Sequence, residues 1–115
     1  MLERLLILSA VLFCIGLYGA LSRRHVIAVL ICIEIMFNAV NIALVAFSRY
    51  ITPAALRATG EVNEAAVSSL LAGQTFALFV IVVAAAEVAL GLALVIAMVR
   101  RKDTTDISEA SLMRR

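Results

Sequence analysis

The sequence contains few of the residues from which catalytic, metal-binding or nucleic-acid-binding sites are built. It has no Trp, one Pro, one His and two Cys, and its formal net charge is only +2. The ten basic residues are scattered at the ends of apolar segments, so they form no nucleic-acid footprint and indicate no strongly acidic partner. His25 stands alone, and we expect it to have a capping or surface role.

Motifs for catalysis and cofactor binding are missing as well. Cys14 and Cys32 lie inside apolar runs and provide neither a metal-ligand spacing nor a disulfide framework, so we expect two small apolar core residues. No Ser/His/Asp or Cys/His nucleophile set can be assembled, and no glycine loop is present that would cradle a phosphate. We therefore expect this chain to have no active site, metal or cofactor of its own.

The sequence is instead rich in long apolar runs. Of its 115 residues, 64% are apolar, and the mean hydropathy is +1.10. Soluble domains are nearer half apolar, whereas a transmembrane helix needs about 20 mostly apolar residues. We predict an all-α, single integral membrane domain over residues 1–115. Its predicted parts are helices at about residues 5–21, 26–48 and 72–99, an outer loop at 49–70 and a tail at 100–115.

The distribution of Lys and Arg predicts the orientation of these helices. Seven basic residues lie on the side of the short 22–25 turn and the tail, against three on the other side. We therefore expect the turn and the C-terminus in the cytoplasm or its organellar equivalent, and the N-terminus outside. We do not expect the first span to be a cleaved signal peptide, because Glu3 balances Arg4 before it. The polar tail is expected to be docked or solvated rather than a domain.

Two carboxylates lie within the apolar runs. Glu34 follows Arg24 by ten residues, which is about 15 Å at the rise of an α-helix. Glu87 precedes Arg100 by thirteen residues, or about 20 Å from the same boundary. Both positions are near the middle of a hydrocarbon core about 30 Å thick, where a charge costs at least about 2.5–3.5 kcal/mol.

A carboxyl group removed from water favours its neutral form, so these two are suited to take up and release protons. The alternative is that both are protonated and only hold helices together by hydrogen bonds. Asn38 and Asn41 follow Glu34 by four and seven residues, which places all three on one helix face. Ser48 lies near the same face, and so does Arg23 if the helix extends that far. This stripe indicates either a hydrated path or a polar subunit interface.

The third helix carries a stripe of small residues, which suits close helix packing. Its members recur every four residues: Ala85, Ala89, Ala93 and Ala97. Glu87 lies nearly opposite this stripe, with Ala84 and Gly91 on its own face. The helix therefore needs partners on both sides, and three helices alone cannot provide them. We infer a subunit of a larger membrane complex.

Three blocks resemble the small K subunit of proton-pumping NADH:quinone oxidoreductase, which is called 4L in mitochondria and the E subunit in photosynthetic membranes. They are "LFCIGLYG", "SRRHVIAVLICIEIMFNAVN" and "GQTFALFVIVVAAAEVALGLALV". The specific features are the E-[IL]-M-x-N-A pattern at Glu34 and the A-A-A-E-x-x-x-G pattern at Glu87. Together the blocks cover all three helices, and the resemblance extends over roughly four-fifths of the chain.

The resemblance implies a three-helix, non-redox subunit in the membrane arm of a proton-translocating quinone oxidoreductase. It implies that Glu34 and Glu87 are steps of the proton path, with Asn38 and Asn41 in support, and that the paired Arg23 and Arg24 of the cytoplasmic turn take part in coupling. Flavin and iron–sulfur clusters would be bound by partner subunits, and quinone by the complex rather than by this chain. The partners implied are antiporter-like subunits, subunits near the quinone chamber, and lipid.

The implied location is a bacterial plasma membrane, a thylakoid or another energy-transducing membrane. The 49–70 loop is longer than this family usually has. Two other functions remain open: the small three-helix subunit of a multi-subunit cation/proton antiporter, and a purely structural membrane-arm subunit. The electron donor, which could be NADH or ferredoxin, and the type of quinone are not indicated by these residues.

Overall fold

The computed structural model describes residues 1–59 and 64–109. They form the helices α1 (Leu2–Ser22), α2 (Val26–Thr59) and α3 (Glu64–Lys102), followed by the short 3-10 helix η1 (Ile107–Glu109). The helices are long because their apolar runs contain few residues that break a helix, and because every backbone polar group in lipid must be paired within the segment. The all-α prediction is confirmed.

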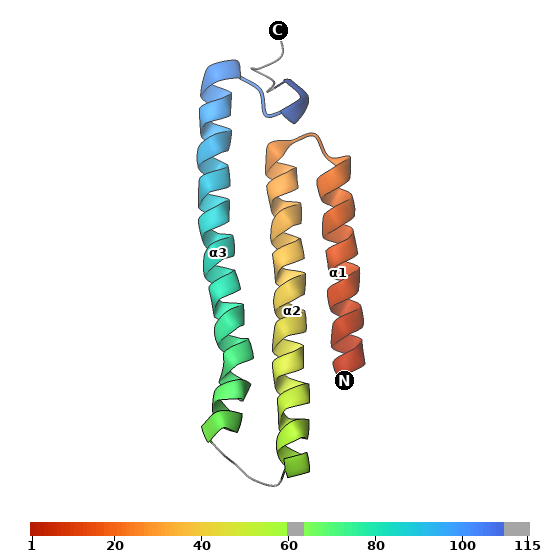
Figure 1. Ribbon diagram of the computed structural model, residues 1–115. Helices are drawn as coiled ribbons and strands as arrows, with labels where there is room; N and C mark the ends of the chain where they lie inside the picture. Colours follow the sequence, from red (N-terminus) through yellow and green to blue (C-terminus); the bar gives the residue numbers. More distant parts are fainter. Residues whose placement is uncertain (60–63, 110–115) are drawn as a thin grey trace.

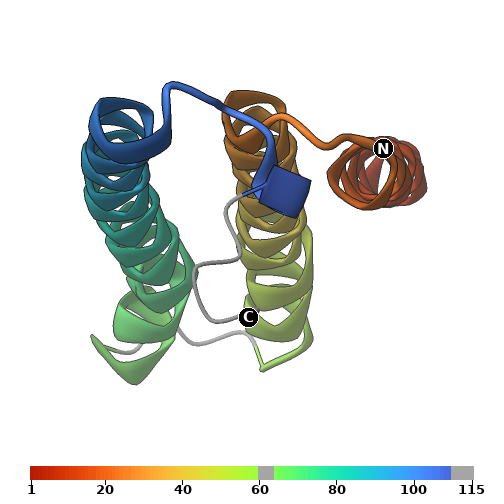
Figure 2. The same cartoon turned by 90° about the horizontal axis from the view of Figure 1, so that it is seen from above.

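The three long helices lie in a row rather than in a closed bundle. α2 lies in the middle, with α1 against one side and α3 against the other (Figures 1 and 2). Neighbouring helices are antiparallel, so the N-terminus lies at the opposite end from the 23–25 turn and the tail. We call the end that carries residues 23–25 the turn end.

Three segments are long and apolar enough to cross a membrane: Leu2–Ser22, Val26–Tyr50 and Leu71–Arg101. The last two agree to within two residues with the predicted spans 26–48 and 72–99, and the first begins three residues earlier than predicted. The chain is thus an integral, multi-pass membrane protein. α2 and α3 both continue beyond their spans at the end opposite the turn.

The segment predicted as an outer loop at 49–70 is helical in its described part. α2 continues through residues 49–59, and α3 already begins at Glu64, so only residues 60–63 of this segment lie outside the described chain. This segment contains Pro53, which removes one helical hydrogen bond. The residues after it include three alanines, a leucine and an arginine, all strong helix formers, and they continue the helix past the proline.

Small residues bring α1 close to α2. A Cβ on Gly16 would lie 2.7 Å from Met36 Cγ and 2.8 Å from the backbone oxygen of Cys32, so glycine is required there. One further contact is polar: the buried Ser9 hydroxyl donates a 2.6 Å hydrogen bond to the Ala39 carbonyl oxygen. Cys14 is exposed on α1, so its prediction as a core residue is wrong, whereas Cys32 is half-buried.

Candidate functional site

The packing of α3 on α2 fixes the register of the two intramembrane glutamates. A Cβ on Gly91 would lie 2.7 Å from Leu30 Cδ2, so these two residues face each other. Gly91 follows Glu87 by four residues, and Leu30 precedes Glu34 by four. Because the helices are antiparallel, Glu34 and Glu87 lie at the same level along the helix axes.

A second contact gives the same register. A Cβ on Gly73 would lie 2.6 Å from Ser48 Cβ. Gly73 precedes Glu87 by fourteen residues and Ser48 follows Glu34 by fourteen. The matched depth expected from counting residues along each helix is therefore present in the structure.

Glu34 lines a cavity of about 230 Å³ between α2 and α3. The other lining residues are apolar: Ile27, Leu30, Ile31 and Ile35 from α2, and Val88 and Leu92 from α3. The Glu34 side chain is half-buried. The apolar walls of this cavity offer the Glu34 carboxyl group no hydrogen bond.

Glu87 is level with Glu34 but does not belong to the same cavity lining. Val88 and Leu92, which do line it, lie about 100° and 140° farther around the α3 axis than Glu87. Glu87 is half-buried, and its neighbours one turn away, Ala84 and Gly91, are buried against α2. The two carboxyl groups therefore share a level while facing different flanks of the α2–α3 contact.

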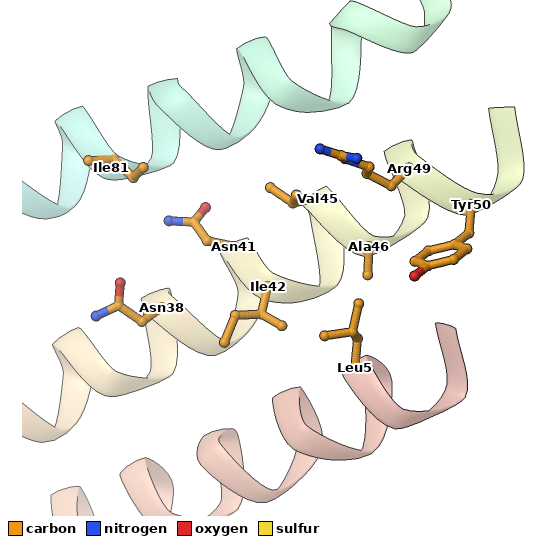
Figure 3. A pocket seen from close by; sticks show the side chains of 9 residues that line it. All are labelled: Leu5, Asn38, Asn41, Ile42, Val45, Ala46, Arg49, Tyr50 and Ile81. Atoms are coloured by element: carbon orange, nitrogen blue, oxygen red, sulfur yellow. The ribbon is translucent and has the colours of Figure 1, made fainter. Parts of the chain in front are cut away.

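The polar residues that follow Glu34 on α2 open into a larger cavity of about 720 Å³. It is lined by Leu5 of α1, Ile81 of α3 and residues of α2 between Asn38 and Tyr50. Asn38 and Asn41 project from α2 on the side that faces α3, and Arg49 extends into the same space (Figure 3). Glu34, Asn38, Asn41 and Arg49 thus follow one flank of α2 from the middle of the membrane to the end opposite the turn.

One atom of this stripe has no partner among the described residues. The Oδ1 atom of Asn41 is buried and accepts no hydrogen bond there. Buried polar atoms in folded proteins are almost always hydrogen-bonded, and leaving one unpaired costs about 1–3 kcal/mol. This acceptor is therefore unsatisfied within the part of the chain that the structure describes.

Arg49 was missed as a site residue in the sequence, where it served only to count charges. The signal was available, because Arg49 follows Asn38 by eleven residues, which is within about 20° of three full helical turns. Its cation stands at the end of the membrane span Val26–Tyr50, one residue from Tyr50. Arg and Tyr are both common at such membrane boundaries.

Two residues assigned to the stripe lie elsewhere. Ser48 is buried against Gly73 of α3 and does not line the larger cavity. Arg23 was included on the condition that the second helix reached it, but α2 begins at Val26. Arg23 instead adopts an extended conformation after α1, with φ −97° and ψ 140°, and its N–H caps the Gly19 carbonyl. Arg23 and Arg24 are both exposed at the turn end.

The alanine stripe of α3 points away from the rest of the chain. Ala85, Ala89, Ala93 and Ala97 are all exposed. α3 contacts α2 through its other small-residue face, which includes the buried Ala77, Ala84 and Gly91. The chain therefore supplies a partner for one side of α3 and leaves the alanine side open.

These features define a small multi-pass membrane protein with two level intramembrane carboxyl groups and an open polar flank. A sequence profile described as NADH-ubiquinone/plastoquinone oxidoreductase chain 4L matches residues 4–115. The chain belongs to this family.

Individual relatives cover nearly the full length. Subunit K of the NADH-quinone oxidoreductase of Geobacillus sp. (strain WCH70) is 49% identical over 109 residues, which are 95% of this chain and 90% of that protein. Subunit 4L of the NAD(P)H-quinone oxidoreductase of the Paulinella chromatophora chromatophore is 46% identical, covering 99% and 96%. The chloroplast subunit 4L of Chaetosphaeridium globosum is 42% identical over 99% of both chains.

The unusual length expected for the 49–70 loop stays a prediction. Membership in the 4L family also favours the quinone oxidoreductase over the cation/proton antiporter.

Proposed function

We propose that this chain is a membrane-arm subunit of a proton-pumping quinone oxidoreductase, in which Glu34 and Glu87 take up and release protons. The observation that supports this most strongly is the shared level of the two carboxyl groups, fixed by the Gly91–Leu30 and Gly73–Ser48 contacts. Helix packing does not explain why two carboxyl groups, each of which is costly to bury in lipid, lie at one depth. A pair of groups that alternate between neutral and charged forms explains both.

The two glutamates would act in sequence rather than as one hydrogen-bonded pair. Glu34 faces the small cavity beside Val88 and Leu92, while Glu87 faces the other flank of the α2–α3 contact. A proton passed laterally through the membrane would therefore enter on one flank of this chain and leave on the other. A change of charge on one carboxyl group would alter the proton affinity of the other, because their fields interact strongly in a medium of low dielectric constant.

Asn38, Asn41 and Arg49 would support the Glu34 side of this path. The amides can hold water or orient a neighbouring subunit's side chain, and the unpaired Asn41 Oδ1 is the acceptor for such a donor. The Arg49 cation lies at the end of the larger cavity opposite the turn, and it would repel protons that approach from that end. We place the turn end in the cytoplasm, because seven basic residues against three lie on that side.

The remaining chemistry of the complex would be carried by partner subunits. This chain has two cysteines, fewer than the four thiolates that an iron–sulfur cluster commonly takes. Flavin, clusters and quinone are accordingly assigned to other subunits, of which the antiporter-like and quinone-chamber subunits are the expected neighbours. The exposed alanine stripe of α3 supports a neighbour on that side.

The test uses the assembled complex in sealed membrane vesicles. We expect Glu34→Gln and Glu87→Gln each to lower proton pumping about a hundredfold or more, the size of effect typical of a lost proton-transfer group. The amount of assembled complex should stay unchanged, because Gln keeps the shape and hydrogen bonding of a neutral Glu. Glu64→Gln is the matched control, since Glu64 is exposed and precedes the membrane span Leu71–Arg101.

A purely structural role for the glutamates predicts the opposite pattern. The Gln variants would then pump at the normal rate, whereas Glu34→Ala and Glu87→Ala would reduce the amount of assembled complex. That result would contradict the proposed proton path.

A further inference from the structure

The tail after α3 turns back onto the turn between α1 and α2. Asp103 has a left-handed φ of 54°, and its N–H donates a 2.8 Å hydrogen bond to the Val99 carbonyl, which ends the helix. Asp is one of the residue types that tolerate this conformation. The chain then crosses from the end of α3 toward α2 (Figure 2).

Two backbone hydrogen bonds join the tail to the start of α2. The Val26 N–H donates to the Thr105 carbonyl oxygen at 3.2 Å, and the Ile107 N–H donates to the Arg24 carbonyl oxygen at 3.0 Å. His25 and Asp106 consequently form an antiparallel β-bridge. The polar tail was expected to be docked or solvated, and its described part is docked.

Side-chain hydrogen bonds, both to the turn and within the tail, also stabilise the docked tail. His25 Nδ1 and Thr105 Oγ1 are hydrogen-bonded at 3.2 Å. Within the tail, the Asp106 N–H donates to Thr104 Oγ1 at 3.2 Å. The Ser108 N–H and hydroxyl both donate to Asp106 Oδ1, at 2.9 Å and 2.7 Å.

The docked tail supplies a hydrogen-bond acceptor and a negative charge, both of which the first turn of α2 lacks. The first N–H groups of a helix have no partner inside it, and the first turn of α2 contains no acidic residue. The Thr105 carbonyl accepts the N–H of Val26, the first residue of α2. The Asp106 carboxylate adds negative charge that interacts with the Arg24 cation at the positive end of the helix dipole.

Asp106 is charged at neutral pH. Hydrogen bonds from the Ser108 hydroxyl and N–H lower the pKa of Asp106 from its usual value, and the charges of Arg24 and His25 lower it further. A lowered pKa in the folded chain means that the carboxylate contributes to docking above the ordinary range near pH 4 and loses this contribution only in acid.

We propose that Thr105, Asp106 and Ile107 form a clasp that holds α3 in register with α2 and so keeps Glu34 level with Glu87. The value of this register for pumping rests on the proposed function. At the end opposite the turn, the chain itself connects α2 to α3 through residues 60–63. At the turn end, within residues 1–59 and 64–109, the clasp makes the corresponding connection. A slide or rotation of α3 would separate the two carboxyl groups, and the clasp opposes it.

The geometry of the clasp is tested by disulfide cross-linking in the assembled complex. Antiparallel residues whose flanking N–H and C=O groups are bonded, as His25 and Asp106 are here, have Cα atoms about 4.5 Å apart. A disulfide tolerates this separation. With Cys14 and Cys32 replaced by Ala, we expect His25→Cys with Asp106→Cys to oxidise readily, and the control pair His25→Cys with Ser108→Cys to oxidise poorly. Equal yields from the two pairs, or none from either, would overturn the clasp.

The role of the clasp is tested by removing one of its hydrogen bonds. Ile107→Pro deletes the N–H that bonds Arg24, while proline is tolerated at the first position of a helix such as η1. We expect pumping per assembled complex to fall about two- to tenfold, the factor that corresponds to one net hydrogen bond. Ile107→Ala keeps the N–H and should pump normally. Equal pumping by the two variants would contradict the proposal.

A rescue experiment separates positioning from a general loss of structure. The triple variant His25→Cys, Asp106→Cys, Ile107→Pro should pump weakly when reduced and regain pumping when its disulfide closes the clasp covalently. Failure of the oxidised form to recover would overturn the positioning role. If the Gln variants of Glu34 and Glu87 pumped normally while rescue succeeded, the proposed proton path would be wrong and the clasp would stand.

Discussion

At the scale of single residues, the polar groups of α2 are the ones that membrane packing does not explain. An apolar side chain at position 34, 38 or 41 would remove the cost of burying a carboxyl or amide group in lipid. The Asn41 Oδ1 atom makes this plain, because it is buried and unpaired among the described residues. We interpret it as the acceptor for a water molecule or for a donor of a neighbouring subunit.

Asn41→Leu tests this interpretation. The change removes an unpaired buried acceptor and keeps a similar volume, so we expect the thermal stability of the complex to be unchanged or raised by about 1 kcal/mol. If Asn41 holds water beside Glu34, proton pumping should fall about tenfold. Ile42→Leu, at the next position in the same cavity lining, is the matched control for altered apolar shape. Normal pumping by Asn41→Leu would exclude Asn41 from the proton path.

At the scale of helices, the membrane spans can be predicted from the sequence, whereas the continuation of α2 and α3 beyond these spans cannot. The spans are long apolar runs, and their boundaries at Val26 and Arg101 are marked by charge and by the loss of hydropathy. Pro53 removes one hydrogen bond from α2, but the helix formers on its C-terminal side outweigh this loss. The helix propensity of the residues after Pro53 thus outweighs the helix-breaking tendency of the proline.

The geometry of the candidate site could likewise be predicted from the sequence only in part. The shared depth of Glu34 and Glu87 follows from counting residues to a common boundary, because every residue adds the same rise along a helix. Their different flanks depend on how α3 is rotated against α2, which the Gly91–Leu30 contact fixes and composition alone does not. The docking of Thr105 and Ile107 depends on backbone hydrogen bonds, for which side-chain identity gives little signal.

The two helix contacts of α2 differ in how firmly they require glycine. A Cβ on Gly16 would meet backbone atoms of α2, at 2.8 Å from the Cys32 oxygen and 3.3 Å from the Met36 nitrogen. A Cβ on Gly91 would meet only the side chain of Leu30, whose methyl groups can move into the adjacent 230 Å³ cavity. The α2 backbone atoms that a Cβ on Gly16 would meet cannot move aside as easily as the Leu30 methyl groups.

We therefore expect Gly16→Ala to destabilise the chain by about 1–3 kcal/mol, the usual cost of overpacking. Gly91→Ala should cost clearly less. The measurement is the thermal midpoint of the purified complex together with the amount of this subunit that it retains. A larger loss for Gly91→Ala than for Gly16→Ala would contradict the packing described here.

At the scale of the whole molecule, three helices in a row leave most of the apolar side chains whose burial is described exposed. α1 and α3 each have α2 as their neighbour and present their other sides outward. Exposed apolar area on this scale is covered by lipid or by other membrane helices. The subunit is thus one layer of a larger assembly, and the proposed proton path would pass through it from one flank to the other.

The most direct test of this path is infrared difference spectroscopy of the complex during quinone reduction. We expect turnover to change the absorption of protonated carboxyl groups, and we expect part of that change to disappear in Glu34→Gln and in Glu87→Gln but to persist in Glu64→Gln. Carboxyl signals identical in all three variants and in the unaltered complex would mean that neither glutamate changes its protonation, and the proposed proton path would be wrong.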